Sequence, residues 1–229
     1  MPHNVVVILQ PSYLPWLGYF AQIQRSDVFV VYDDVQYDKH GWRNRNRIKT
    51  PHGIQWLTVP ILTKGQNWLT NREAKINNAI DWRKKHLASI RQNYSKAPYF
   101  SDYIGIFDML YILSWDSLLD LDMAIINALC NMLGLKREII FSSNLGVEGE
   151  TIERLIAICH HLGANIFYEG SAGRNYIDEK IFTDAGITLE YQDYNHPVYQ
   201  QLHGGFESHL SVIDLLFNCG PSSLEVLKQ

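Results

Sequence analysis

Two short runs of β-branched and aliphatic residues near the N-terminus place the strongest constraint on the fold of this chain. Val5–Leu9 and Val28–Tyr32 are continuous apolar runs without polar alternation, which is typical of strands buried on both faces of a sheet. Residues 16–24 between them show helical spacing, with three apolar residues on one face: Leu17, Phe20 and Ile23. A strand, a helix and a second strand within about thirty residues indicate a βαβ unit. The pattern therefore predicts an α/β protein with a mainly parallel sheet.

Later segments continue the alternation of strands and helices. We expect strands at residues 57–62, 138–141, 165–168 and 187–191, and helices at 149–163 and 211–217. Between them, residues 82–94 and 118–133 have helical patterns, and Gly134 is suited to cap the second of these helices. The sequence therefore predicts a single α/β domain over residues 1–229, with a helical insertion at about residues 78–135. The apolar helix at 118–133 suits a core or a subunit interface equally, so the oligomeric state stays open.

Composition and charge exclude several classes of protein. The chain is 46% hydrophobic and 19% charged, with a formal charge of −4, which gives no electrostatic reason to bind nucleic acid or an anionic membrane. No apolar run approaches the ~20 residues of a membrane span, and Met1–Asn4 does not begin a signal peptide. Cys130, Cys159 and Cys219 form no C-x-x-C pair, which is typical of buried thiols in a reducing compartment. We expect a cytoplasmic protein with no nucleic-acid partner and no membrane span.

The loop that follows the first strand is one candidate site. Ligands bind at the carboxyl ends of strands in open parallel sheets, and residues 10–18 form a polar loop stiffened by two prolines. Gln10 offers an amide that donates and accepts, and Tyr13 offers an aromatic face with a hydroxyl. The alternative is a rigid turn in which Tyr13 and Trp16 pack inward.

A denser set of polar residues follows the second strand. Asp33 and Asp34 at a strand end can hold Mg²⁺ or act as a general base. If residues 42–47 are extended, three arginines point one way and two asparagines the other, and guanidinium groups bind phosphates or carboxylates bidentately. The alternative is a solvated surface hairpin whose arginines neutralise Asp33, Asp34 and Asp38. We predict substrate binding by Gln36, Trp42, Arg43, Asn44, Arg45, Asn46 and Arg47.

Two later segments complete the set of candidates. After the strand at 165–168, Gly170, Ser171, Arg174 and Tyr176 can form a backbone anion nest with one guanidinium, although a plain turn explains the segment nearly as well. His196 precedes a proline and can act as a general acid or base near neutral pH. His196, His203 and His209 lack the close spacing of metal ligands, so we assign no metal ligand. The cofactor stays unknown, and Mg²⁺ is expected only if the protein is a nucleotidyltransferase.

Four stretches of this sequence resemble the WbqC-like family of bacterial proteins. They are residues 10–20, 26–27, 32–36 and 42–48, and the later pieces 176–178 and 206–218 are also similar to that family. Members occur in bacterial gene sets for O-antigen and other glycans that contain amino sugars, so the resemblance implies that pathway. A looser likeness to cytidylyltransferases and class I synthetases implies a nucleotide-binding-like (Rossmann-like) core. Tyr19 stands where those proteins carry a second phosphate-binding histidine, which argues against nucleotidyl transfer.

Three functional hypotheses follow, ranked in this order. The first is a transferase that moves an acyl or aminoacyl group onto the amine of a nucleotide-linked amino sugar, a phosphate-bearing small molecule. In it Asp33, Asp34 or His196 is the catalytic base, and Tyr13 and Trp42 stack on a ring of the substrate. The second is nucleotidyl or adenylyl transfer, with Mg²⁺ on Asp33 and Asp34 and phosphates on residues 170–174. The third is a protein that binds a glycan intermediate without catalysis.

Overall fold

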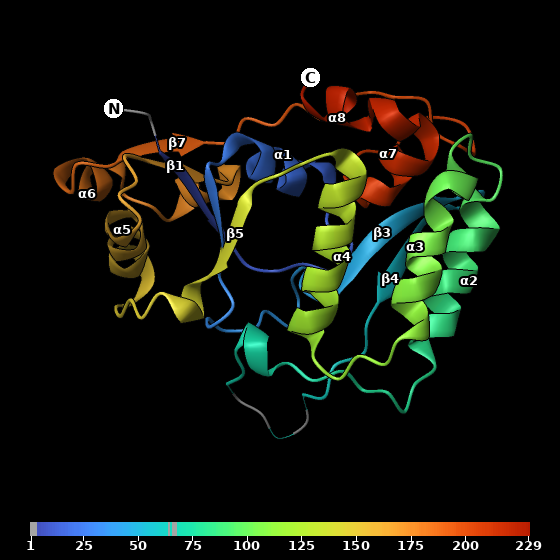
Figure 1. Cartoon of the computed structure of the whole chain (residues 1–229), viewed down its shortest axis with the longest axis horizontal. Coiled ribbons are helices and arrows are strands. Elements are labelled where there is room, and N and C mark those ends of the chain that lie inside the picture. Colours follow the sequence, from blue (N-terminus) through green and yellow to red (C-terminus); the bar gives the residue numbers. More distant parts are fainter. Residues whose placement is uncertain (1–3, 64, 66–67) are drawn as a thin grey trace.

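The computed structural model describes residues 4–63, 65 and 68–229, and a five-stranded parallel sheet forms its centre (Figure 1). Residues 1–3, on which the expectation about a signal peptide partly rests, lie outside the described residues. The sheet order is β5-β2-β1-β6-β7, and every neighbouring pair is parallel. Taken along the chain, this is the 3-2-1-4-5 order of Rossmann-like sheets. The predicted α/β class is therefore confirmed. The strands are β1 (Val5–Leu9), β2 (Val28–Val31), β5 (Glu138–Phe141), β6 (Ile166–Glu169) and β7 (Thr188–Tyr191).

Helices cover both faces of this sheet, which explains why its strands are apolar without alternation. Successive strand side chains point to opposite faces. Val6 and Val30 pack with α5 (Thr151–His161) and α6 (Glu179–Asp184), whereas Val7 and Phe29 pack with α1 (Leu17–Arg25). Figure 1 shows α5 and α6 on the side of the sheet away from α1.

Three helices occupy the region predicted as a helical insertion. The last of them, α4, begins after Ser117, whose hydroxyl accepts a hydrogen bond from the Asp120 backbone N–H. It ends at Gly134, which has the left-handed conformation expected of a C-cap (φ 72°). Aromatic side chains of α2 and α3 pack on Phe217 of α7, which joins the C-terminal helices to this region. The helices are α2 (Trp82–Tyr94), α3 (Phe100–Ile112), α4 (Leu118–Leu133), α7 (Val212–Cys219) and α8 (Ser223–Leu227), with short 3₁₀ helices η1 (Asn71–Glu73), η2 (Ser142–Asn144), η3 (Ser171–Asn175) and η4 (Gly220–Ser222).

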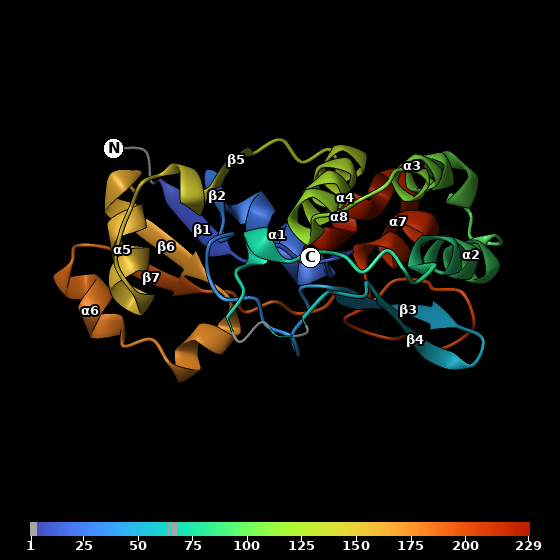
Figure 2. The same ribbon diagram turned by 90° about the horizontal axis from the view of Figure 1, so that it is seen from below.

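The strand expected at residues 57–62 is placed wrongly by the sequence pattern. The structure instead has an antiparallel hairpin of β3 (Arg45–Thr50) and β4 (Gly53–Thr58), which forms a separate two-stranded sheet. Gly53, the first residue of β4 after the turn, has a φ of 105°, a conformation that favours glycine. Five of the six residues of β4 are exposed, so the strand lacks the apolar signature of a buried strand. Figure 2 shows this hairpin below α2 and α7.

A long irregular segment, residues 192–210, carries the chain from β7 back to α7. Hydrogen bonds fix it in place: the Lys49 ammonium donates to the Gly205 carbonyl (2.8 Å) and to Gln201 Oε1 (3.2 Å). Gln192 Nε2 donates to the carbonyl of Gly18 at 2.9 Å. This segment brings His209 against Trp16, the residue before α1, and packs His196 against His209. Within residues 4–63, 65 and 68–229, no helix has both the length and the apolar character needed to cross a membrane.

Candidate functional site

Two adjoining cavities lie at the carboxyl ends of the central strands. The first, here the switch-point lobe, has a volume of about 340 Å³ and is lined by residues at the carboxyl ends of β1, β2 and β6: Gln10, Tyr32 and Glu169. The second, here the aromatic lobe, has a volume of about 260 Å³ and is lined by Trp16, Tyr19, Gln22, Trp42 and His209 among others. Leu9, Gln10 and Arg43 line both lobes. The two lobes therefore form one cleft at the point where the strand order reverses between β1 and β6, which is where ligands bind in such sheets.

Arg43 lies between the two lobes. Its Nη1 atom donates to the carbonyl oxygens of Gln10 (3.0 Å) and Pro11 (3.2 Å), which fixes the guanidinium against the loop after β1. Burial lowers the pKa of Arg43, while the nearby Tyr19 and Asp122 act in the opposite direction. An arginine stays protonated under such conditions, so this part of the cleft carries a positive charge.

Glu169, at the end of β6, is the titratable group that stands out in the switch-point lobe. Burial raises the pKa of Glu169 to about 7, although hydrogen bonds from the Gly170 backbone and the Tyr176 side chain favour its charged form. Gly173 makes room for this side chain, because a Cβ atom there would lie 2.5 Å from Glu169 Cγ. The sequence analysis did not select Glu169. Its position at the carboxyl end of a parallel strand, where ligands bind in such sheets, is the sequence signal that could have identified it.

The aromatic lobe takes its shape from Trp16. The Trp16 ring stacks on His209 with 5.1 Å between centroids and meets Tyr194 edge-on at 5.4 Å. It also lies directly over Gly18, where a Cβ atom would come within 2.1 Å of the indole. The glycine therefore allows Trp16 to lie flat along α1.

Asp33 and Asp34 lie at the end of β2 as predicted, but their carboxylates face η2 and α5. Asp33 accepts hydrogen bonds from the Ser143 hydroxyl (2.7 Å), the Ser143 backbone N–H (3.1 Å) and the Ser142 hydroxyl (3.0 Å). Asp34 accepts from Ser142 Oγ (2.6 Å) and Arg154 Nη2 (2.5 Å). Burial alone would raise the pKa of Asp34, but these hydrogen bonds hold it below its usual value. Neither aspartate is among the residues that line the two lobes, so their catalytic role stays a prediction.

The predicted alternation of arginines and asparagines is present at the start of β3. Asn44 and Asn46 point inward and donate to the carbonyls of Val59 and Leu14, each at 2.7 Å. This pattern anchors the hairpin to the loop after β1.

Arg45 and Arg47 instead stack on the tryptophans of the outer hairpin surface. Their guanidinium groups lie 5.2 and 5.7 Å from the centroid of Trp56, and Arg47 lies 5.2 Å from that of Trp42. Arg43 instead lines the cleft, so the three arginines do not share one binding surface as their alternation predicted. Gln36 is exposed and bridges to Thr70, outside both lobes.

The segment after β6 places its predicted residues in different surroundings. Gly170 precedes η3, and Ser171 and Arg174 are exposed on that 3₁₀ helix. The Arg174 guanidinium lies 4.4 Å from the centroid of Tyr191 and pairs with Asp193 at 2.9 Å. Tyr176, which is 63% exposed, lines the switch-point lobe. Of these four residues, Tyr176 alone contributes to the lining of the cleft in the described part of the chain.

His196 lies beside the cleft and not in its lining. Its ring packs 5.4 Å from His209, which does line the aromatic lobe. Burial lowers the pKa of His196. Its Nδ1 lies 3.0 Å from the Pro197 carbonyl oxygen, which fits a protonated Nδ1 and leaves Nε2 as an acceptor.

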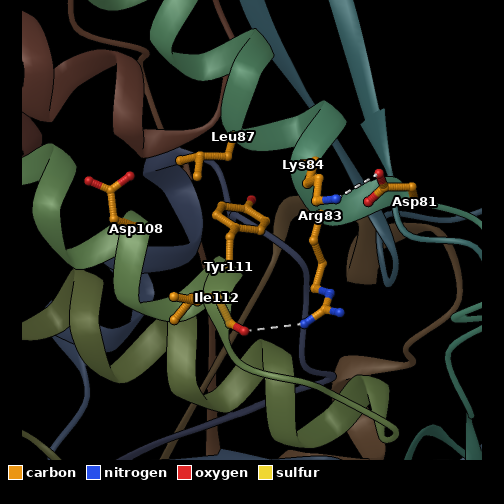
Figure 3. Close-up of a pocket in the computed structure, with 7 residues that line it drawn as sticks. All are labelled: Asp81, Arg83, Lys84, Leu87, Asp108, Tyr111 and Ile112. Atoms are coloured by element: carbon orange, nitrogen blue, oxygen red, sulfur yellow. Dashed lines mark hydrogen bonds and ion pairs between the residues drawn. The ribbon is translucent and has the colours of Figure 1, made fainter.

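Tyr13 is fully buried, and its hydroxyl bonds to His86 Nδ1 (2.8 Å) and to the Tyr111 hydroxyl. Stacking of Tyr13 on a ligand, as predicted from the sequence, requires the ring to leave this packing. Tyr111 also borders a third cavity, of about 370 Å³, between α2 and α3 (Figure 3). Figure 3 shows Arg83 extended toward the Ile112 carbonyl oxygen and Lys84 toward Asp81. This cavity contains none of the site residues predicted from the sequence.

Metal binding receives no geometric support within the described ranges. Among residues 4–63, 65 and 68–229, no cluster of three or more histidine, cysteine, aspartate or glutamate side chains is arranged to hold a metal ion.

The fold and the cleft define an α/β protein with a Rossmann-like sheet and a two-lobed ligand cleft at its switch point. The chain belongs to the WbqC-like protein family, which it matches over residues 10–226. A protein of Mycobacterium tuberculosis H37Rv, described as uncharacterized protein Rv1507c, is 38% identical over 225 residues, which is 97% of each chain. No solved structure matches.

Proposed function

We propose that this protein transfers an acyl or aminoacyl group onto the amine of a nucleotide-linked amino sugar. The observation that carries the proposal is the Glu169 carboxyl, which lines the cleft and has a pKa raised to about 7. A base is most effective when its pKa lies near the working pH, because it is then both available and strong enough to take a proton. Membership of the WbqC-like family supports the choice of an amino sugar, since that resemblance implies pathways of amino-sugar glycans.

The proposed step is aminolysis of an activated acyl donor such as a thioester. The sugar ammonium gives a proton to the Glu169 carboxylate, and the neutral nitrogen attacks the acyl carbonyl carbon. A carbon–nitrogen bond forms, and the bond from that carbon to the donor's sulfur breaks. The attacking nitrogen loses a second proton, which the leaving thiolate takes. Two adjoining lobes suit two reactants, and Arg43 between them supplies positive charge for a phosphate or for the developing oxyanion.

Glu169 replaces Asp33, Asp34 and His196 as the favoured base in this proposal. The two aspartates accept hydrogen bonds from neighbouring serines and Arg154, and His196 lies behind His209. Arg45 and Arg47 keep their proposed role of binding the substrate pyrophosphate, and the contact of Arg47 with Trp42, which lines the aromatic lobe, supports that role for Arg47.

The test is a transfer assay with a panel of nucleotide-linked amino sugars and acyl-coenzyme A donors, read by mass spectrometry of the sugar product. Glu169→Gln should lower kcat by about 10²- to 10⁴-fold. Glu225→Gln, the same substitution on exposed α8, is the matched control and should leave kcat unchanged. Equal rates for Glu169→Gln and the unaltered protein would overturn the assignment of the base. Release of pyrophosphate from a nucleoside triphosphate with Mg²⁺, without acylation, would favour nucleotidyl transfer instead.

A further inference from the structure

The aromatic lobe is lined by two buried side chains that each keep a polar atom without a hydrogen-bond partner. The Tyr19 hydroxyl and Gln22 Oε1 are both buried, and no group in residues 4–63, 65 or 68–229 forms a hydrogen bond to either. Both side chains are 5% exposed and line the same lobe. They are three residues apart on α1, so they lie on one face of the helix. Because buried polar groups are nearly always hydrogen-bonded, this pair points to a bound molecule.

The orientation of the Gln22 amide is fixed by its neighbours. Gln22 Nε2 donates to Gln192 Oε1 at 3.0 Å, and Gln192 Nε2 donates in turn to the Gly18 carbonyl at 2.9 Å. Rotating the Gln22 amide would place two oxygens against each other. These hydrogen bonds therefore fix Gln22 Oε1 as an acceptor without a donor among the described residues.

The remaining walls of the lobe are aromatic. Trp16 is held by His209 and Tyr194, and Trp42, which is 38% exposed, also lines the lobe. Of the described residues that line it, Arg43 is the single permanently charged one. The volume of about 260 Å³ is below that of common drug-sized ligand sites, so the lobe suits a single small ring.

We propose that the aromatic lobe binds one hydroxyl-bearing pyranose ring, with its hydroxyls on Gln22 Oε1 and the Tyr19 hydroxyl and its C–H groups against the aromatic lining, which includes the partly exposed Trp42. A sugar hydroxyl both donates and accepts, which matches an acceptor-only oxygen beside a phenol. This assignment rests on the proposed function in one respect: the identity of the pyranose as the amino sugar comes from that function. The pyranose then lies next to the switch-point lobe, which contains Glu169 and shares Gln10 and Arg43 with the aromatic lobe.

Tyr19→Phe is a sharp test, because it removes a hydroxyl that has no partner within the described protein. The melting temperature should stay unchanged, whereas loss of a sugar hydrogen bond should weaken binding about tenfold. The probes are D-glucosamine and D-galactosamine at millimolar concentration, followed by saturation-transfer NMR and calorimetry. Tyr103→Phe on α3 is the matched control and should bind the sugars as the unaltered protein does.

Three results would overturn the assignment. They are absence of binding of both aminopyranoses to the unaltered protein, equal binding by Tyr19→Phe, and displacement of the sugars by uridine or adenosine, which would assign the lobe to a nucleobase. The assay is independent of turnover. Sugar binding that depends on Tyr19 without any acyl transfer would support the pyranose site and overturn the proposed function. Acyl transfer with an unchanged KM in Tyr19→Phe would do the reverse.

Discussion

Replacing Tyr13 by phenylalanine should destabilise the protein strongly, although the substitution removes a single oxygen. Tyr13 is fully buried, and its hydroxyl is the common partner of His86 Nδ1 and the Tyr111 hydroxyl. Tyr13→Phe therefore leaves two buried polar groups without this partner. An unsatisfied buried group costs roughly 1–3 kcal/mol, so the expected loss in the free energy of unfolding is about 2–4 kcal/mol. For a protein of this size the melting temperature should fall by roughly 5–15 °C.

The assay is urea and thermal unfolding of Tyr13→Phe, Tyr111→Phe and the double variant, followed by circular dichroism at pH 7. Because the two tyrosines share one hydrogen bond, the double variant should lose less than the sum of the single losses, by about 0.5–3 kcal/mol. A loss below about 0.5 kcal/mol in Tyr13→Phe would refute the reasoning, because the buried partners would then be satisfied in another way.

Three further predictions concern the acidic residues near the cleft. The pKa of Glu169 is raised from 4.5 to about 7, so the folded state holds an extra proton between these values and loses stability as pH rises from 4.5 to 7. Urea titrations over this pH range should show that Glu169→Gln lacks this loss. The same pH dependence of the unfolding free energy in both proteins would contradict the prediction. Gly173→Ala places a Cβ atom 2.5 Å from Glu169 Cγ and should lower kcat for acyl transfer more than about tenfold; an unchanged kcat would show that Glu169 adapts. Asp33→Asn should lose about 1–3 kcal/mol of unfolding free energy through its bonds to Ser142 and Ser143. A stable but inactive Asp33→Asn variant would instead favour the catalytic role predicted from the sequence.

The sheet could be predicted from the sequence because its strands are buried on both faces. Val5–Leu9 and Val28–Val31 show this directly, since a continuous apolar run needs no knowledge of its partners. Strand β4 was missed for the opposite reason: its residues are mostly exposed, and the apolar pattern starts only at its end.

The location of the cleft was also accessible from the sequence, but its chemistry was not. A loop after a buried strand indicated the region of Gln10, and Arg43 and Trp42 were selected by residue type. The sequence analysis selected Asp33 and not Glu169 as a catalytic base, but the surroundings of the two carboxyl groups favour Glu169. Asp33 accepts hydrogen bonds from serine residues of η2, whereas Glu169 is half-buried beside Gly173 and has a raised pKa. The hydrogen bonds of Asp33 come from a segment more than a hundred residues away, and the raised pKa of Glu169 comes from tertiary burial. Local sequence patterns give no information on either.

Arg43 forms part of the wall of both lobes, and this shared wall has a thermodynamic consequence. An anionic molecule in one lobe that pairs with the Arg43 guanidinium weakens the electrostatic attraction of that group for a molecule in the other lobe. The two binding free energies are then linked, and linkage is reciprocal: whatever factor the first ligand imposes on the affinity of the second, the second imposes on the first. Through this one side chain, either reactant therefore changes the affinity of the cleft for the other by the same factor, whichever of the two binds first.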